Sequence, residues 1–511
     1  MRFDLLRPLN LTIALAPDLL LVAGAMLLLL VSAGRESASR QRAVGRWSIV
    51  LCVLTLGAVA YMWWAGHTAT RGVIAVDAFR WATDVVVLLG AILTVALSMD
   101  YLEREHIDVG EAHVLILLAT AGMMLLAAAR DLMILFLGIE LMSISVYVLA
   151  GLNRRSSRAA EAALKYFLLG AFSSGFLLYG IALVFGATGS TNIADIGAAV
   201  LERGLATNAM LLIGVALMLV GLAFKVAAAP FHMWTPDVYE GAPTPMTGFM
   251  AVAVKAAAFA VFLRLWMEAF PYLNATWHKP LWYLAVFTMV VGNVIALAQK
   301  NIKRMLAYSS IAHAGYLLVA VVVSNFEGAS AFLFYVLAYT LATVGAFAVV
   351  MALSEVGERG QFIEDYAGLW RIRPGLSAAM AVFMLALLGF PIFGGMGFFA
   401  KWYVLQAALR PPSQTNLAIW VVLTSVVSAG YYLYVVMVMF MKPRPADAPS
   451  PARVPGMTRF VIVTCAIVLL VVGVWPRPVL SVARRSLPQL VHLTEDIPRA
   501  NAAPVTSPAV P

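Results

Sequence analysis

The chain consists largely of long runs of apolar residues that polar loops separate. A membrane core about 30 Å thick needs about 20 apolar residues per helix, and the runs have this length. They lack the period-two alternation of a membrane barrel, so they favour helices. The pattern predicts an all-α polytopic membrane protein with about fourteen transmembrane helices, near 15–33, 46–65, 81–99, 112–129, 131–150, 162–186, 208–230, 244–270, 280–299, 302–323, 329–353, 375–409, 416–441 and 458–475.

Composition supports a membrane location and excludes several functions. Of the 511 residues, 62% are hydrophobic and 12% are charged, whereas a soluble domain has about a quarter charged residues. The net charge of +9 comes mostly from Arg and Lys in short loops, not from one basic face, so nucleic acid is not an expected partner. Cys52 and Cys465 are isolated and form no CxxC motif, which indicates neither an iron–sulfur cluster nor structural zinc nor a disulfide framework.

Several basic residues lie inside the predicted spans, where an ionisable group at the bilayer centre costs about 2.5–3.5 kcal/mol. They are Lys165, Lys225, Lys255, Arg264 and Lys401. Groups of this kind usually face a polar interior, pair with one another or mark an ion path. Arg264 is near the end of its span and can snorkel to the membrane surface or pair with Glu268, four residues further on.

Two further ionisable residues are central in their spans. Glu140 is too deep for its short side chain to reach water, and His313 is about midway along its own span. A structural contact between helices is the alternative for Glu140. Glu161 and Lys165 share one helix face, where a local ion pair would satisfy both charges.

Proline and glycine interrupt two lysine-bearing spans. Pro230 follows Lys225 in the seventh span, and Pro391 with several glycines precedes Lys401 in the twelfth. Such breaks free backbone groups and let water or ions approach, and their separation by five spans is typical of internal repeats. Lys225 could alternatively snorkel to the membrane surface, whereas Lys255 has less freedom to do so.

Alternating buried acids and bases are what a proton path requires. Burial favours the neutral form of a lysine and a nearby carboxylate favours the charged form, so a moving charge can switch the lysine between holding and releasing its proton. We therefore interpret Lys225 as a residue whose proton moves.

Four segments resemble one known family. They are LFLGIELMSISVYVLAG (135–151), EAALKYFLLGAFSSG (161–175), KVAAAPFHMWTPDVYEGAPTPMTGFMAVAVKAAAF (225–259) and NIKRMLAYSSIAHAGYLL (301–318). They are similar to the antiporter-like N subunits of the proton-translocating NADH:quinone oxidoreductase, respiratory complex I. The resemblance covers roughly the fourth to the thirteenth span. The sister antiporter-like subunits of the same enzyme usually lack a lysine at the position of Lys255.

The resemblance implies a fold of fourteen helices with two inverted five-helix repeats and broken helices seven and twelve. The expected organisation is helices 1–3 in 1–111, a first repeat (helices 4–8) in 112–270, a second repeat (helices 9–13) in 280–441, helix 14 in 442–475 and an irregular tail in 476–511.

The resemblance also implies that the buried ionisable residues form one proton path. Its members would be Glu140 and Lys225 as the acid and base of the first half, Lys255 as the connecting lysine, His313 as a relay and Lys401 as the terminal group, with Glu161 and Lys165 in support. The loop before Lys401 is longer than the family pattern implies.

By the same resemblance, NADH, flavin, iron–sulfur clusters and quinone belong to partner subunits, and this chain holds no cofactor or metal. Its partners would be other membrane-arm subunits, including the sister antiporter-like subunits, within the lipid bilayer of a bacterial inner membrane. Two alternatives are a subunit of a multisubunit cation/proton antiporter and a structural subunit without ion traffic, which the number of buried titratable groups disfavours.

The loops after odd-numbered spans carry most of the Arg and Lys, which predicts that both termini are periplasmic. We expect cysteines placed in the loops 34–46, 151–160, 300–304 and 442–457 to react only from the cytoplasmic side of oriented vesicles. Labelling of the 153–158 loop from the periplasmic side would contradict this topology.

Overall fold

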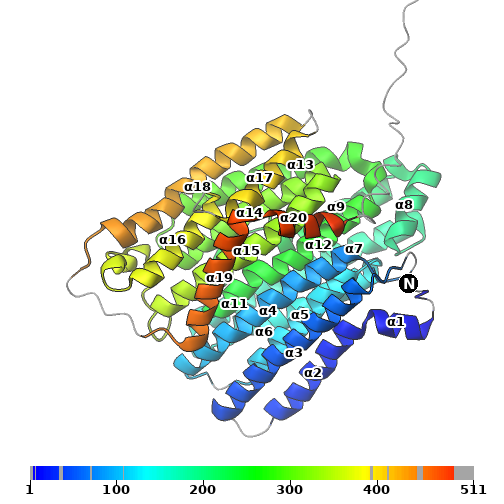
Figure 1. Ribbon diagram of the computed structural model, residues 1–511. Helices are drawn as coiled ribbons and strands as arrows, with labels where there is room; N and C mark the ends of the chain where they lie inside the picture. Colours follow the sequence, from blue (N-terminus) through cyan, green and yellow to red (C-terminus); the bar gives the residue numbers. More distant parts are fainter. Residues whose placement is uncertain are drawn as a thin grey trace, which may run out of the picture.

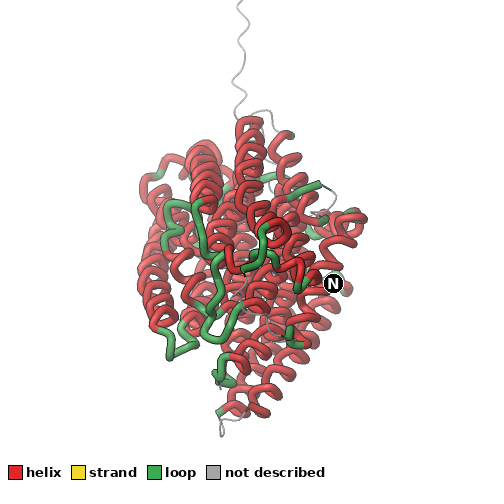
Figure 2. The backbone as a smooth tube through the Cα atoms, turned by 90° about the vertical axis from the view of Figure 1, so that its left-hand side faces the viewer, coloured by secondary structure: helices red, strands yellow, loops and turns green. Residues whose placement is uncertain are grey.

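The computed structural model describes residues 4–5, 7–33, 38–69, 72–107, 109–391, 395–410, 414–445 and 453–487. Long helices run side by side through most of the molecule, with α2 and α3 at one edge and α18 at another (Figure 1). A view turned by 90° shows helices joined by loops, and no strand is drawn among the described residues (Figure 2). The prediction of an all-α fold is confirmed.

The first half of the chain contributes the helices as far as α12. They are α1 (Pro8–Ala14), α2 (Ala16–Ser32), α3 (Ala38–Trp64), α4 (Ala78–Arg104), α5 (Glu111–Ala128), α6 (Leu132–Ala150), α7 (Ser157–Thr188), α8 (Ile193–Glu202), η1 (Leu205–Thr207), α9 (Ala209–Val226), α10 (Trp234–Gly241), α11 (Thr244–Phe249), η2 (Met250–Val254) and α12 (Lys255–Glu268).

The second half contributes the remaining elements. They are η3 (Pro271–Leu273), α13 (Asn274–Leu297), α14 (Ile302–Val323), α15 (Phe326–Leu353), η4 (Ile363–Tyr366), η5 (Leu369–Arg371), α16 (Pro374–Leu388), α17 (Met396–Leu409), α18 (Thr415–Met441), α19 (Gly456–Val474) and α20 (Arg477–Arg485).

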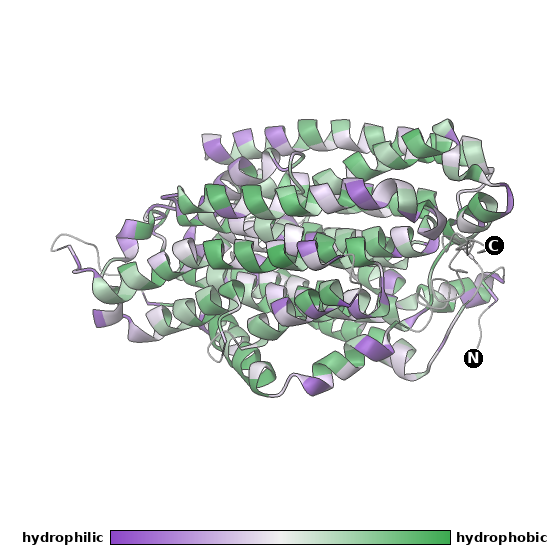
Figure 3. Cartoon of the chain, turned by 90° about the horizontal axis from the view of Figure 1, so that it is seen from above, coloured by the Kyte–Doolittle hydropathy of each residue, from purple (hydrophilic) through white to green (hydrophobic). Residues whose placement is uncertain are grey.

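Most of the predicted spans correspond to one long helix each. Within the described ranges, 12 helices are long and apolar enough to cross a membrane, or 13 if α1 and α2, bent by 71°, form one span. The broken pair α16 and α17 occupies the predicted twelfth span. Hydrophobic residues cover most of each long helix (Figure 3). The chain is therefore a multi-pass membrane protein.

Both predicted helix breaks are present. The seventh span ends where α9 stops at Val226, because Ala227 adopts a left-handed conformation with φ 59° and Pro230 follows shortly after. The twelfth span is interrupted between Leu388 and Met396, where Gly389 has φ 75°. Residues 392–394 of this second break lie outside the described ranges.

Glycine lets neighbouring helices approach closely in both halves. A Cβ atom on Gly122 of α5 would overlap the backbone of α6 near Met142, and one on Gly292 of α13 would overlap the backbone of α14 near Ala312. Small residues at such crossings bring helix backbones together in membranes, where van der Waals packing drives helix association. The pairs α5–α6 and α13–α14 therefore pack by the same means.

The C-terminal region departs from the expected irregular tail. Residues Arg477–Arg485 form α20, which begins at a proline-rich turn and packs on α15. Proline at the first helical positions starts a helix well, because its missing N–H needs no partner there. The remainder of the expected tail, 488–511, lies outside the described residues.

A loop between α15 and η4 ties three parts of the chain together. The Glu358 carboxylate accepts hydrogen bonds from Tyr101 at the end of α4 (2.9 Å), from the backbone and hydroxyl of Thr244 at the start of α11 (2.8 and 2.7 Å), and from Lys303 of α14 (2.7 Å). Burial acts to raise the pKa of Glu358, but the Lys303 ammonium and the Thr244 hydrogen bonds outweigh it, so this pKa lies below its usual value.

Removing the Glu358 charge should destabilise the protein at neutral pH. Lys303 is fully buried, so Glu358→Gln leaves its ammonium without a counter-ion, at a cost of about 3 kcal/mol. Because the Glu358 pKa is lowered, its contribution is present above about pH 4.3, the unfolded value, and is lost as the pH falls through the folded value. Thermal unfolding of the detergent-purified chain should therefore show a difference from wild type that shrinks in acid. Glu355→Gln in the same loop, where the side chain is exposed, is the control and should change nothing.

Candidate functional site

The residues Glu140, Lys225, Lys255, His313 and Lys401, called the ionisable row below, are carried by α6, α9, α12, α14 and α17. These helices are distributed across the bundle (Figure 1). All three lysines and the histidine are buried, and Glu140 is partly buried.

Lys225 turns inward from the last turn of α9. Its ammonium donates to the Ser143 hydroxyl (2.6 Å) and to the Tyr147 hydroxyl (3.2 Å), both on α6, and the residue is only 2% exposed. The geometry does not match a snorkelling lysine, whose ammonium would be at the membrane surface. At this C-terminal end of α9, the helix dipole also favours a positive charge.

Glu140 lies on the same face of α6 as the hydroxyls that hold Lys225. Residues 140, 143 and 147 are three and seven positions apart, which aligns them along one side of a helix. The Glu140 carboxylate accepts a hydrogen bond from Ser174 of α7 (2.5 Å). The acid and the base therefore lie near the same face of α6 but have separate hydrogen-bond partners, and the described residues show no ion pair between them.

Lys255 follows a π-helical turn, η2, at the start of α12. Its ammonium donates to the backbone carbonyl of Ser310 on α14 (2.8 Å) and to the hydroxyl of the same residue. π-Helical turns occur often at functional sites because they interrupt the regular hydrogen-bond ladder. Ser310 is three residues before His313, so Lys255 joins α12 to the part of α14 that carries the histidine.

His313 is held by two tyrosines from other helices. Its Nδ1 is 2.6 Å from the Tyr335 hydroxyl of α15, and its Nε2 is 3.1 Å from the Tyr432 hydroxyl of α18. Tyr432 also bonds to Ser309, next to the Ser310 that holds Lys255. Hydroxyl groups both donate and accept, so each can pass a proton along such a chain.

Lys401 binds the end of the preceding half-helix. Its ammonium donates to the carbonyl of Leu388, the last residue of α16 (2.9 Å), and lies 4.6 Å from the ring centre of Tyr316. The carbonyls at a helix end lack partners within the helix, and the dipole there favours a positive charge. A Cβ at Gly389 would press on the Lys401 side chain, so this break needs a glycine.

A further hydrogen-bond chain leads from Tyr431, the neighbour of Tyr432 on α18, toward Lys401. The Tyr431 hydroxyl donates to Asn293 of α13 (2.9 Å), and the Asn293 amide donates to the Tyr316 hydroxyl of α14 (3.2 Å). Tyr431 packs against Tyr432, with ring centres 4.3 Å apart. None of these residues was predicted, because the sequence places them on separate helices and gives no local signal of their contact.

The predicted supporting pair lies apart from the ionisable row. Lys165 and Glu161 form the expected ion pair (2.7 Å), but their side chains are 42% and 63% exposed. Lys165 also pairs with Asp237 of α10 (2.9 Å), which Arg304 of α14 contacts in turn (2.9 Å). These four residues line a polar pocket of about 220 Å³ near the N-terminal end of α7.

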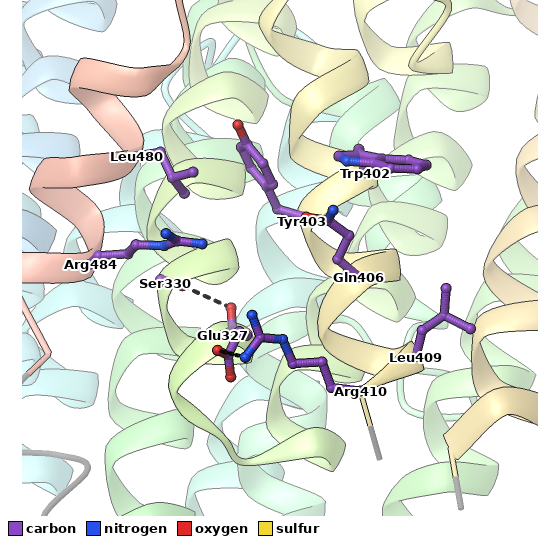
Figure 4. Close-up of a pocket in the computed structure, with 9 residues that line it drawn as sticks. All are labelled: Glu327, Ser330, Trp402, Tyr403, Gln406, Leu409, Arg410, Leu480 and Arg484. Atoms are coloured by element: carbon purple, nitrogen blue, oxygen red, sulfur yellow. Dashed lines mark hydrogen bonds and ion pairs between the residues drawn. The ribbon is translucent and has the colours of Figure 1, made fainter. Parts of the chain in front are cut away.

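A second cavity, of about 450 Å³, opens beside α17. Trp402 and Tyr403, the neighbours of Lys401 in sequence, line it together with Glu327, Arg410 and, from α20, Arg484 (Figure 4). Lys401 itself does not line it, because its side chain points to α16. The cavity therefore places polar groups next to the helix that carries the last residue of the row.

The described residues contain no group of three or more His, Cys, Asp or Glu side chains that could hold a metal ion. Both cysteines are buried and unpaired. The row itself offers amine, imidazole, carboxyl and hydroxyl groups, each of which can take up or release a proton.

The Lys225 environment depends on a glycine in α7. A Cβ at Gly170 would overlap the Tyr147 hydroxyl, which the edge-to-face contact with Tyr166 (4.7 Å) and the Lys225 bond hold in place. Gly170→Ala should therefore lower the melting temperature by an amount that corresponds to about 1–3 kcal/mol. Gly175→Ala is the matched control on the same helix, since its Cβ would meet no atom within 4 Å, and it should be neutral or gain up to about 1 kcal/mol. Equal melting temperatures for the two variants would contradict the tight fit at Tyr147.

Comparison with known proteins identifies the family. Residues 129–429 match the family described as NADH:quinone oxidoreductase/Mrp antiporter, TM. NADH-quinone oxidoreductase subunit N of Gemmatimonas aurantiaca is 52% identical, over 98% of this chain and 95% of the relative. Subunit N of Trichlorobacter lovleyi is 46% identical, over 95% of this chain and 98% of the relative.

Solved structures show the same architecture. A chain of respiratory complex I from Thermus thermophilus with bound aureothin is 38% identical and superposes with a TM-score of 0.76, over 92% of this chain and 99% of that chain. A chain of the Mrp complex from a Dietzia species shares the fold, with a TM-score of 0.82 at 20% identity, over 94% of this chain and 98% of that chain. The chain therefore belongs to the NADH:quinone oxidoreductase/Mrp antiporter family and, within it, to the N subunits of NADH-quinone oxidoreductase.

Proposed function

We propose that this chain translocates protons in the membrane arm of an NADH:quinone oxidoreductase, and that the ionisable row is its proton path. Relatives that share 52% and 46% of its residues bear the name of subunit N of that enzyme. NADH oxidation and quinone reduction take place in partner subunits, which hold the flavin and the iron–sulfur clusters. This chain supplies the part that moves protons.

One observation carries the proposal. The three lysines of the row are buried, and their ammonium groups are held by hydroxyl and carbonyl oxygens with no carboxylate ion pair among the described residues. A buried ammonium without a counter-ion is costly, whereas neutral lysine is not, so such a group can release its proton. Arg264 provides the contrast, because the carboxylates of Asp77 and Glu268 pair with it and fix its charge.

The second half of the path runs through hydroxyl groups. From Lys255 a proton would pass to Ser310, and from the adjacent Ser309 it would reach His313 through Tyr432. Among the described residues no hydrogen bond joins the two serine hydroxyls, so water would carry the proton across this step. From there the chain of Tyr431, Asn293 and Tyr316 leads to the ring that faces Lys401. The histidine is suited to the middle of this route, since each ring nitrogen already contacts a hydroxyl and the two can exchange roles as donor and acceptor.

Water would complete the path between Lys225 and Lys255. No side chain bridges these two lysines directly among the described residues. Ordered water commonly bridges polar groups that no side chain joins.

The same proposal covers the arrangement of the chain. The segments 112–270 and 280–441 form two inverted repeats, after helices in 1–111 and before the last span in 442–475. Both repeats have a broken helix with a lysine beside the break, since Lys225 is in the last turn of α9 and Lys401 binds the end of α16, and both have a glycine-packed helix pair. Both termini are periplasmic in a bacterial inner membrane, and sister antiporter-like subunits are neighbours in the complex.

Substitution of Lys225 tests the path. Lys225→Ala should leave the complex assembled but lower NADH-driven quinone reduction and proton translocation together, because a coupled pump with a blocked path stalls. Lys225→Arg should be nearly as damaging, since arginine keeps the charge but does not release its proton. The measurements are NADH:quinone turnover and vesicle acidification in membranes with matched complex content.

Glu140 supplies the companion variants. Glu140→Gln should resemble Lys225→Ala, while Glu140→Asp should keep part of the activity because it retains a titratable group at the same place. Lys279→Ala, outside the row, is the control and should retain wild-type turnover. Full activity in Lys225→Arg would refute a proton path through this residue.

A further inference from the structure

A second group of buried charges lies apart from the ionisable row, where α2, α4 and α12 meet. It contains three arginines and four carboxylates, and all but Arg130 are less than a tenth exposed. These residues, called the arginine cluster, are Asp18, Asp77, Arg80, Asp84, Arg130, Arg264 and Glu268. No role in the proton path involves them.

One side of the arginine cluster is fully paired. Arg264 donates to both carboxylate oxygens of Asp77 (2.7 and 2.9 Å) and to Glu268 (3.0 Å), and it is 1% exposed. Arg130 lies 3.3 Å from the second oxygen of Glu268. Two-pronged arginine–carboxylate contacts of this kind are strong and hold both partners in their charged forms.

The other side is centred on Arg80 of α4. Its guanidinium donates to Asp18 of α2 (2.5 Å) and to the backbone carbonyls of Ala14 and Ala75 (3.3 and 3.0 Å). These bonds use its two terminal nitrogens and leave Nε without a hydrogen-bond partner. Asp18 is therefore the carboxylate that satisfies the Arg80 charge.

Asp84 differs from the other three carboxylates. It is fully buried, neither oxygen has a hydrogen-bond partner, and its closest charge is Arg80 Nε at 3.5 Å, four residues back on the same helix. An ionised carboxylate in such a place would lack both water and hydrogen bonds, which is far more costly than a neutral carboxylic acid. The arginine cluster also has one carboxylate more than it has arginines.

We propose that Asp84 binds a proton, so that the arginine cluster is a proton-binding site outside the ionisable row. With one proton on Asp84, three carboxylates balance three guanidinium groups. Release of that proton would create a second anion beside Arg80 and would draw the guanidinium away from Asp18. Proton occupancy at Asp84 would thus control the contact between α2 and α4.

Within the part of the chain that the structure describes, no further charge is recorded that could balance Asp84. The neighbouring charged groups are Asp18 from α2, Asp77 and Arg80 at the start of α4, and beyond them Arg264, Glu268 and Arg130. The titratable residues of α5, Glu111 and His113, are at its other end, and His113 lies beside Met99, fifteen residues from Asp84, or about 22 Å along α4. η2, which also packs on α4, has no titratable residue.

Amide substitutions separate a protonated from an ionised Asp84. Asp84→Asn reproduces the shape and neutrality of the protonated acid, so the complex content of membranes should stay at the wild-type level. Asp18→Asn is the matched control in the same cluster, and it should cause a clear loss of assembled complex because it leaves Arg80 buried without its counter-ion. A loss in Asp84→Asn as large as that in Asp18→Asn would show that Asp84 is needed as an anion and would overturn the proposal.

Infrared difference spectra give a direct reading that does not depend on activity. The spectrum of the wild-type complex minus that of the Asp84→Asn complex, at neutral pH, should contain the carbonyl stretch of a protonated carboxylic acid, shifted in D₂O. The two stretches of a carboxylate in its place would overturn the proposal. Asp84→Glu retains the acid, so the spectrum of its complex minus that of the Asp84→Asn complex should contain the same band at a shifted position; its absence would refute proton binding at this site.

Discussion

An ionisable side chain inside an apolar helix bundle must be paired, hydrogen-bonded or neutral, and this constraint shapes the interior of the protein. The arginines meet it by pairing, as Arg264 does with Asp77 and Glu268. The three lysines of the ionisable row meet it with neutral oxygen partners, such as Ser143 for Lys225. A guanidinium stays charged whereas an ammonium can become neutral, so the two kinds of basic group differ in whether they can exchange a proton.

A helix interruption supplies the oxygen atom that Lys401 needs. Lys401 reaches the carbonyl that α16 leaves without an internal partner at Leu388, and Lys225 occupies the last turn of α9. A continuous helix would use this carbonyl in its own hydrogen-bond ladder. The break at Gly389 is therefore part of the binding site for the Lys401 ammonium. The break at Ala227 instead ends the helix that carries Lys225, and the hydroxyls of Ser143 and Tyr147 on α6 hold its ammonium.

The sequence predicted what depends on local pattern. Apolar runs located the spans, proline and glycine located both breaks, and the depth of Glu140 and Lys255 marked them as unusual. The contacts of Tyr316 and Tyr432 were not predictable, since each tyrosine is an ordinary member of an apolar run until another helix brings it to His313 or Lys401.

Arg264 shows a different limit of sequence reasoning. Its spacing allowed either snorkelling or pairing with Glu268, and the pairing is present, but the carboxylate of Asp77 comes from a segment 187 positions away. The expected helix-face pair at Glu161 and Lys165 is also present, yet it is exposed and lies outside the ionisable row. Spacing along one helix thus indicated which charged residues can pair, but it did not indicate whether the pair is buried in the bundle or exposed.

The loop at Glu358 has a mechanical consequence. One carboxylate holds the end of α4, the start of α11 and the start of α14, and so it fastens the N-terminal helices and both halves of the bundle at one end. The π-helical turn before Lys255 is one short helix away from this anchor point. Because Glu358 holds Thr244, a movement of α12 that displaces Lys255 leaves Thr244 in place. The backbone between them, which includes the five residues of η2, then takes up the displacement.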